Sequence, residues 1–253
     1  MSELLGFNNL TKALSFNLYD FAVALNDEER ASYIKYIDER YSAKQIEALF
    51  VRIAEIIDAN VLNISSKDFD PYGASVVLLM SDMKASDHAD LMQQTVVNVQ
   101  LDKSHICAHT YPDSLDPEGI CSFRVDIDIA TCGAISPLHA LNFMLNSFES
   151  DVVVCDYVVR GFTRNSNGKK IYTDHKIDSI QEFIAPNLLS NYEAFDDNVP
   201  ETMTYQTRLL QNSYDESCYF RNPMSVPEKI KKSKLELIRK EMHQIYRGIS
   251  EES

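Results

Sequence analysis

The chain has 253 residues, of which 45% are hydrophobic and 25% are charged, the composition of a folded globular protein. No apolar run approaches the roughly 18 residues that a membrane-spanning helix needs. The 24 basic and 38 acidic residues leave a net charge of −14. An acidic surface repels phosphate groups, so the charge argues against nucleic acid as the main partner.

The cysteines indicate a reducing compartment. They are odd in number, form no CxxC pair, and follow an N-terminal stretch, MSELLGFNNL, that lacks a basic leader and a long apolar segment. We therefore expect reduced thiols, no local zinc knuckle and a cytoplasmic protein. The five residues are Cys107, Cys121, Cys132, Cys155 and Cys218.

The first sixty residues predict a strand and two helices. Apolar residues alternate over residues 14–18, as in a strand with one buried face. Acidic residues open a predicted helix over residues 26–41. Ser42 and Gln45 form a capping-box pattern that begins a second amphipathic helix, which we expect to end near Asn60.

The middle of the chain predicts further strands. Residues 61–82 read as strand, turn and strand, with the turn built on Pro71 and Gly73. A polar stretch over residues 83–94 predicts a loop or a short helix, and residues 95–111 return to a strand pattern.

The clearest alternation follows at residues 121–133, CSFRVDIDIATCG. Successive side chains of a strand point to opposite faces, so apolar and polar residues separate cleanly here. The apolar face carries Phe123, Val125, Ile127 and Ile129, and the other face carries Arg124, Asp126, Asp128 and Cys132.

The second half predicts more strands and a long C-terminal helix. Ser136 and Pro137 begin a helix as cap and first residue, and a strand follows over residues 151–162. A turn is expected at residues 165–170, and a helix over residues 227–247 that ends at a glycine. Antiparallel strands with helices between them predict one α+β domain over residues 1–253, a two-layer sandwich of a largely antiparallel sheet packed on helices.

The stretch DKSHICAHTY at residues 102–111 concentrates reactive side chains in one predicted strand. The simplest interpretation is structural, because serine, histidine and cysteine are common in strands and cysteine packs as a small apolar residue. His105, Cys107 and His109 would share one face, a pattern compatible with zinc, with Cys132 or Cys121 as a fourth ligand.

Nucleophilic catalysis is a third interpretation of the same stretch. A Cys/His or Ser/His pair is compatible with it, although the chain lacks the glycine-rich nucleophile elbow of hydrolases. Spacing alone does not separate the structural, metal-binding and nucleophilic interpretations.

Longer motifs identify a family. The stretch LDKSHICAHTYPD resembles the self-processing site of bacterial S-adenosylmethionine decarboxylase proenzymes, which are cleaved between lysine and serine. The resemblance runs strongly over residues 6–178 and more weakly to the C-terminus, and is closest to the longer bacterial type. The other matching motifs, in order, are GFNNLTKALSF, PYGAS, ATCG, ISPLHALN and DYVVRGFTR.

The resemblance implies self-cleavage. In the family, the serine hydroxyl, here Ser104, attacks the carbonyl of the preceding residue, here Lys103, and converts the amide to an ester. Elimination then releases a β chain of residues 1–103, and the α chain of residues 104–253 acquires a pyruvoyl group at its N-terminus. That carbonyl forms a Schiff base with the substrate and acts as the electron sink that pyridoxal phosphate provides in other decarboxylases.

The resemblance also implies roles for side chains near the pyruvoyl group. His109 matches the histidine that accepts a proton during processing, and Ser75 matches the serine that assists it. Cys132 matches the cysteine that donates a proton to the substrate α-carbon. Ser104 and His109 have opposite parity on a regular strand, so a bulge or release of the new terminus must bring them together.

Substrate binding follows from the same match. Phe69 lies where the family stacks an aromatic ring on adenine, and Asp113 lies where relatives usually carry the glutamate that binds the ribose hydroxyls. Tyr111 is assigned to the same set. The shorter Asp113 leaves open another amino acid, such as arginine or ornithine, as substrate.

The implied function is decarboxylation of S-adenosylmethionine to the aminopropyl donor for spermidine synthesis. The implied partners are the substrate and the chain's own α and β pieces, in a homo-oligomer of αβ units with the active site near a subunit interface. Magnesium is a possible further cofactor, without evident ligands in the sequence. The rival interpretations are an unprocessed, non-catalytic paralogue or a metal-binding module, and intact Ser104, His109 and Cys132 argue against an inactive chain.

Overall fold

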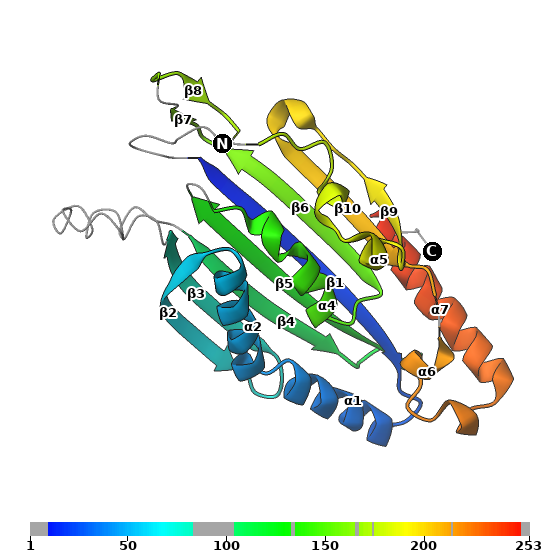
Figure 1. Ribbon diagram of the computed structural model, residues 1–253. Helices are drawn as coiled ribbons and strands as arrows, with labels where there is room; N and C mark the ends of the chain where they lie inside the picture. The colour runs from blue at the N-terminus through cyan, green and yellow to red at the C-terminus, as the bar shows by residue number, and fades with distance from the viewer. Residues whose placement is uncertain are drawn as a thin grey trace.

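The computed structural model describes residues 10–82, 104–132, 135–164, 167–173, 175–213 and 215–248. An eight-stranded sheet organises this part of the chain, in the order β2-β3-β4-β5-β1-β6-β10-β9, and every pairing in it is antiparallel (Figure 1). Its strands are β1 Thr11–Val23, β2 Ala59–Asp68, β3 Ala74–Asp82, β4 His105–Asp113, β5 Ile120–Cys132, β6 Val152–Arg160, β9 Tyr192–Asp196 and β10 Thr204–Gln211.

The helices and a small hairpin complete the described structure. The hairpin pairs β7 Thr163–Arg164 with β8 Lys170–Ile171. The α-helices are α1 Asp27–Arg40, α2 Ala43–Ile56, α4 Leu141–Ser147, α5 Pro186–Leu189, α6 Glu216–Tyr219 and α7 Glu228–Arg247. The 3₁₀ turns are η3 Pro137–Ala140, η4 Ile180–Phe183, η5 Pro200–Thr202 and η6 Pro223–Ser225.

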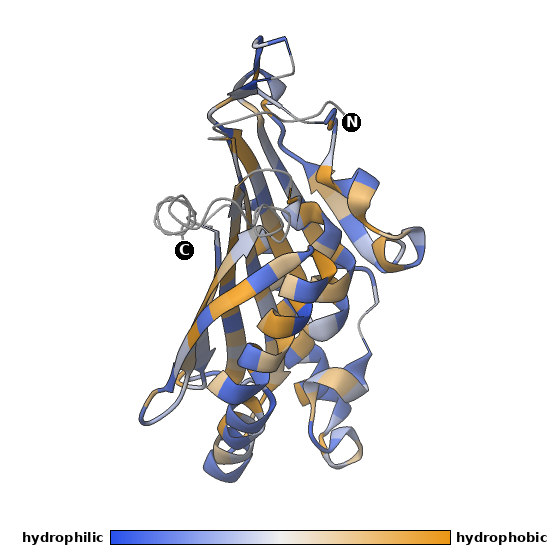
Figure 2. Cartoon of the chain, turned by 60° about the vertical axis from the view of Figure 1, so that its left-hand side comes forward, coloured by the Kyte–Doolittle hydropathy of each residue, from blue (hydrophilic) through white to orange (hydrophobic). Residues whose placement is uncertain are grey.

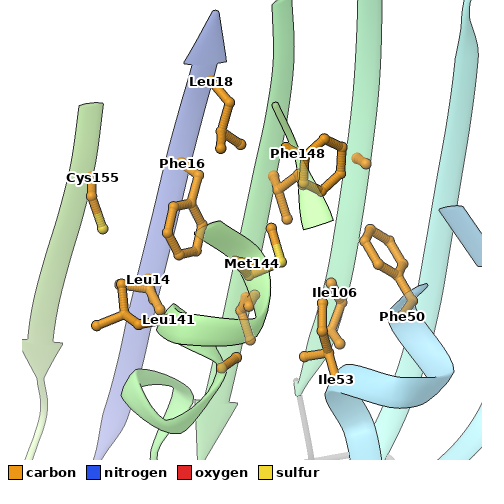
Figure 3. Close-up of a cluster of buried hydrophobic side chains, with 14 of the residues drawn as sticks. Leu14, Phe16, Leu18, Phe50, Ile53, Ile106, Leu141, Met144, Phe148 and Cys155 are labelled. Carbon is orange, nitrogen blue, oxygen red and sulfur yellow. The ribbon is translucent and has the colours of Figure 1, made fainter. Parts of the chain in front are cut away.

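The main core fills the space between one face of the sheet and the helices α2 and α4 (Figure 3). Leu14 and Phe16 of β1 meet Phe50 and Ile53 of α2 and Met144 of α4 in this cluster, all fully or almost fully buried. Side chains alternate along each strand, and Figure 2 shows the matching alternation of hydrophobic and hydrophilic residues. We call this side of the sheet the helix-covered face.

The opposite side, which we call the open face, carries the polar residues of the strands. Strand β4 contributes His105, Cys107, His109, Tyr111 and Asp113 to this face, and β5 contributes Arg124, Asp126, Asp128, Ala130 and Cys132. Helix α7 covers one end of this side, where Ile238 and Met242 pack on Phe21, Val152 and neighbouring apolar residues. The two predicted layers therefore gain a partial third layer.

The structure confirms the α+β class, the strand at residues 121–133 and the C-terminal helix with Gly248 in a left-handed conformation (φ 65°) as its cap. Two details were wrong. The second helix ends at Ile56 rather than near Asn60, because the chain enters β2 at Ala59. The Ser42 side chain makes no capping bond, and the Ala43 amide donates instead to Asp68 Oδ1 at 2.7 Å.

Other expectations have different outcomes. The Ser136 side chain makes no capping bond, and Pro137 begins a 3₁₀ turn before α4. Strands β9 and β10 were not predicted. The stretch at residues 83–94 and the strand pattern before Ser104 lie outside the described residues.

Candidate active site

Ser104 stands directly before β4 and is only 2% exposed. The backbone amide of Cys132 donates to Ser104 Oγ at 3.1 Å, and the amide of Met80 donates to the Ser104 carbonyl at 3.1 Å. Bonds from β5 and β3 thus hold the hydroxyl and the backbone of this residue from opposite sides. Lys103 lies outside the described residues.

Cys132 is the last residue of β5 and is half-buried on the open face, beside Thr11 of β1. The Thr131 hydroxyl donates to the carbonyl of Ile135 at 3.1 Å, which ties the end of β5 to the start of the next segment. The structure therefore brings Cys132 next to Ser104, and we call these two residues the Ser104 group.

Ser75 and His109 form a second group further along the sheet. They are direct cross-strand partners between β3 and β4, and Asp126 of β5 is the partner of His109 on its other side. Directly opposite residues share a face and have Cβ atoms about 5 Å apart. Both are therefore placed on the open face, within reach of one molecule bound there.

Asp126, beside His109, already has two partners. Asn17 Nδ2 donates to it at 2.5 Å, and the Arg124 guanidinium forms a two-pronged ion pair with it. The carboxylate hydrogen bond raises the pKa of Arg124, which stays charged. Sequence reasoning placed these acidic residues on the polar face of β5 but did not identify the network, because it depends on cross-strand register.

The candidate binding residues lie at the same end of β4 as His109. Tyr111 is 50% exposed, with the Arg124 guanidinium 5.1 Å from its ring centre, and Asp113 ends the strand. Phe69 is 46% exposed in the turn between β2 and β3, with Lys67 Nζ 5.4 Å from its ring centre. We call Ser75, His109, Tyr111, Asp113 and Phe69 the His109 group.

The two groups are well separated within one chain. His109 lies five residues after Ser104, a separation of roughly 17 Å along an extended strand. The β4–β5 register runs without a shift from His105 to Asp113, so the expected bulge is absent from this strand. Of the two predicted routes, the bulge is thereby excluded for His105–Asp113, and release of the new terminus after cleavage stays a prediction.

The alternative chemistry of this stretch finds no support. His105, Cys107 and His109 do share the open face, but among the described residues no group of three His, Cys, Asp or Glu side chains could hold a metal ion. Burial, with Asp128 nearby, raises the pKa of the Cys107 thiol, and burial raises that of Cys121 to about 11. Both thiols are therefore poor nucleophiles.

All five cysteines are free thiols, as predicted. No helix in the described ranges is both long and apolar enough to cross a membrane.

Comparison with known proteins places these motifs in one family. A family model described as S-adenosylmethionine decarboxylase matches residues 38–161. The S-adenosylmethionine decarboxylase proenzyme of Xanthomonas campestris pv. campestris (strain B100) is 48% identical over 97% of this chain and 95% of its own length. That of Xylella fastidiosa (strain M12) is 51% identical over 84% of this chain and 82% of its own.

Among solved structures, the Trypanosoma brucei AdoMetDC-delta26 monomer aligns with 80% of this chain and 66% of its own, at 14% identity and a TM-score of 0.42. At this sequence identity and TM-score, the similarity does not establish a relationship. The relationship rests on the sequence relatives, which match almost the whole chain.

Proposed function

The chain belongs to the S-adenosylmethionine decarboxylase family, and from this premise we propose that a pyruvoyl group made from Ser104 carries its reaction. The enzyme releases CO2 from S-adenosylmethionine and so supplies the aminopropyl donor for spermidine synthesis. No observation in the fold favours arginine or ornithine as the substrate.

Self-processing begins at Ser104. Its Oγ attacks the carbonyl carbon of Lys103, a C–O bond replaces the C–N bond, and the amide becomes an ester. Elimination then releases residues 1–103 with a carboxylate at Lys103, and hydrolysis of the remaining dehydroalanine yields ammonia and the pyruvoyl group. The observation that carries this proposal is the fixed position of Ser104, whose Oγ and carbonyl each accept a backbone hydrogen bond.

The pyruvoyl carbonyl supplies an electron sink for the pair left behind when CO2 departs. The protein's own side chains move protons around it. We assign His109, assisted by Ser75, as the acceptor of the proton removed in the elimination, and Cys132 as the donor that returns a proton to the α-carbon. The amide of Cys132 already bonds Ser104 Oγ, which supports a thiol close to the reacting atoms.

The separation of the two groups supports a site built from two copies of the chain. We place the open faces of two αβ units together, with the Ser104 group of one protomer against the His109 group of its partner. A two-fold axis then creates two equivalent sites. The regular register of β4 keeps the two groups roughly 17 Å apart along one chain, which supports a site shared between chains. We propose that release of the new terminus at residue 104 after cleavage then turns the pyruvoyl group toward the open face.

The open face suits a cationic substrate. We assign the exposed rings of Phe69 and Tyr111 to adenine and the carboxylate of Asp113 to the ribose hydroxyls, and the exposure of both rings supports this assignment. Asp128 adds negative charge that favours the sulfonium, whereas the charge of Asp126 is paired with Arg124. We derive no step through magnesium, because the described residues offer no cluster of ligands for it. Free thiols support a cytoplasmic location.

A denaturing mass spectrum of the purified protein tests the processing step. We expect two chains that divide between Lys103 and Ser104, with a pyruvoyl group on the larger one, and release of labelled CO2 from carboxyl-labelled S-adenosylmethionine. Arginine and ornithine serve as control substrates and should release none. A single unmodified chain of 28.8 kDa would contradict the proposal.

A further inference from the structure

The segment that follows β4 is attached to helix α1 by one side chain. Arg30 donates from Nη1 to the carbonyl of Ser114 at 2.9 Å and from Nη2 to the carbonyl of Asp116 at 3.0 Å. The planar guanidinium suits such a two-pronged contact, and its charge strengthens both bonds. A residue of α1 thereby fixes two of the three carbonyls in residues 114–116.

The same short segment holds Asp113 in place. The amide of Leu115 donates to Asp113 Oδ1 at 2.9 Å, which sets the orientation of the carboxylate. Arg30 therefore bonds the carbonyls of residues 114 and 116, and the Asp113 side chain bonds the amide of the residue between them. A shift of residues 114–116 would move the carboxylate of Asp113.

Two hydrogen bonds from backbone amides also hold the far end of this segment: Asp116 Oδ1 accepts from the Ile120 amide at 3.1 Å, and the Asp116 carbonyl accepts from the Gly119 amide at 3.1 Å. Leu115 is 77% exposed, so apolar burial does not anchor it. A cleft of about 440 Å³, lined in part by Arg30, Pro71, Tyr72 and Ser114, lies where α1 faces the segment and the turn that follows Phe69. Arg30 is thus the side chain that ties the segment to α1 beside this cleft, through the carbonyls of Ser114 and Asp116.

Two further contacts connect helices to the neighbouring loops. Lys234 of α7 pairs with Glu118 at 2.9 Å, but Glu118 is largely exposed and such surface pairs contribute little. Asp38, also on α1, accepts from the Gly73 amide at 3.4 Å, a long bond to the other binding loop. The Arg30 contact is shorter than the Asp38 bond, is charge-assisted and has two hydrogen bonds.

Helix α1 is itself a rigid base for this contact. Ile37 and Tyr41 near its end are almost fully buried in the main core, and the Tyr41 ring stacks on Phe123 at 4.5 Å and on Phe148 at 5.4 Å. A guanidinium on a fixed helix can hold an exposed loop in one position.

We propose that Arg30 is a positioning residue for substrate binding, which acts on the ribose of the nucleoside through Asp113. This inference rests on the proposed function. Because the Arg30 guanidinium bonds the segment after Asp113, its loss should weaken binding and leave both self-processing and the chemical step almost unchanged.

The test compares Arg30→Ala with the wild-type chain. We expect complete processing by mass spectrometry, a kcat within about twofold of wild type, and a KM for S-adenosylmethionine raised on the order of tenfold, as loss of charge-assisted hydrogen bonds implies. Arg30→Lys, which keeps the charge but not the fork, should restore part of the binding. Arg52→Ala, which removes an exposed arginine of α2 paired with Glu55, is the matched control.

A double-mutant comparison separates positioning from general stability. In an Asp113→Ala background, Arg30→Ala should raise KM less than twofold, because its route to the substrate is already lost. Lys35→Ala, another residue at the same cleft, should leave KM unchanged in both backgrounds.

Several outcomes would overturn the inference. They are an unchanged KM in Arg30→Ala, a fall in kcat equal to any rise in KM, or the same effect with and without Asp113. If Arg30→Ala does not fold, the same criteria apply to Arg30→Lys. An active wild-type chain with an unaffected Arg30 variant would reject this inference alone, whereas a wild-type chain without processing or activity would reject the proposed function and this role together.

Discussion

The two ends of β4 are built differently. At its start, Ser104 is buried and held by backbone hydrogen bonds from β3 and β5. At its other end, Tyr111 is half exposed, and Asp113 depends on a loop that Arg30 ties to a helix. Backbone ladders provide the rigidity that bond-breaking chemistry needs, and loops allow adjustment to a ligand. We therefore expect changes at Ser104 and Cys132 to affect processing and turnover, and changes at Phe69, Tyr111 and Asp113 to affect KM.

Replacement of Ser104 should have the largest effect. Ser104→Ala removes the hydroxyl that attacks Lys103, so we expect one 28.8 kDa chain by mass spectrometry and no labelled CO2. Ser150→Ala, at another buried serine, is the control and should process normally. Cleavage in Ser104→Ala would reject the assignment of Ser104 as the nucleophile of self-processing.

Replacement of Cys132 should separate self-processing from decarboxylation, the two reactions that we assign to the start of β4. Cys132→Ala keeps the backbone amide that bonds Ser104 Oγ, so some processing should remain, while kcat should fall about 100-fold through loss of the proton donor. Single-turnover CO2 release by the processed fraction is the measurement. Cys107→Ala, also half-buried on the open face, should keep its kcat, and equal rates in the two variants would reject the assignment.

Replacement of Phe69 should affect binding only. Stacking of a base on an aromatic ring contributes about 1–3 kcal/mol, so Phe69→Ala should raise KM on the order of tenfold with processing intact. Phe195→Ala removes a similarly exposed ring on the distant strand β9 and should change neither constant. A processing defect in Phe69→Ala would contradict the assignment of Phe69 to substrate binding alone.

A buried carboxyl near the binding end should produce the smallest effect, on stability. Asp151 accepts from the Tyr219 hydroxyl at 2.7 Å and from the Phe21 amide at 2.9 Å, and burial raises its pKa from 3.8 to about 6. The folded state therefore binds the proton of this carboxyl more tightly than the unfolded state does. As pH rises from about 4 to 6, the free energy of unfolding should fall by roughly 2 kcal/mol.

Asp151→Asn should largely remove this dependence of the free energy of unfolding on pH between about 4 and 6. Urea unfolding at pH 4, 5, 6 and 7 measures the change, with Asp156→Asn on β6, the strand that follows Asp151, as a control that keeps the wild-type slope. An unchanged slope in Asp151→Asn would assign the pH dependence to other groups.

Much of the fold could be predicted from local patterns. The alternation in β5 identified both of its faces, and Gly248 marked the end of α7. Periodicity shows that a helix has a buried side but not which face of the sheet it meets, so the position of α7 on the open face was not predictable. The early end of α2 also depends on tertiary pairing of β2 with β3.

The candidate site was predicted as a set of residues rather than as an arrangement. The opposite parity of Ser104 and His109 was readable from the sequence, but the pairing of Ser75 with His109 depends on strand register. The bond between Ser104 and Cys132 likewise joins strands that are distant in sequence. The two contacts of Arg30 have no local signal, because they cross 84 and 86 positions of the chain.

The strand order has a consequence for the enzyme after the proposed cleavage. Strands β1, β2 and β3 precede Ser104, and the other strands of the large sheet follow it, so β1 lies between β5 and β6 of the other piece. Separation of the two pieces would require three ladders to open, those of β3 with β4, β1 with β5 and β1 with β6. The cut chain should therefore stay interwoven, and dissociation of its halves should coincide with unfolding of the whole domain.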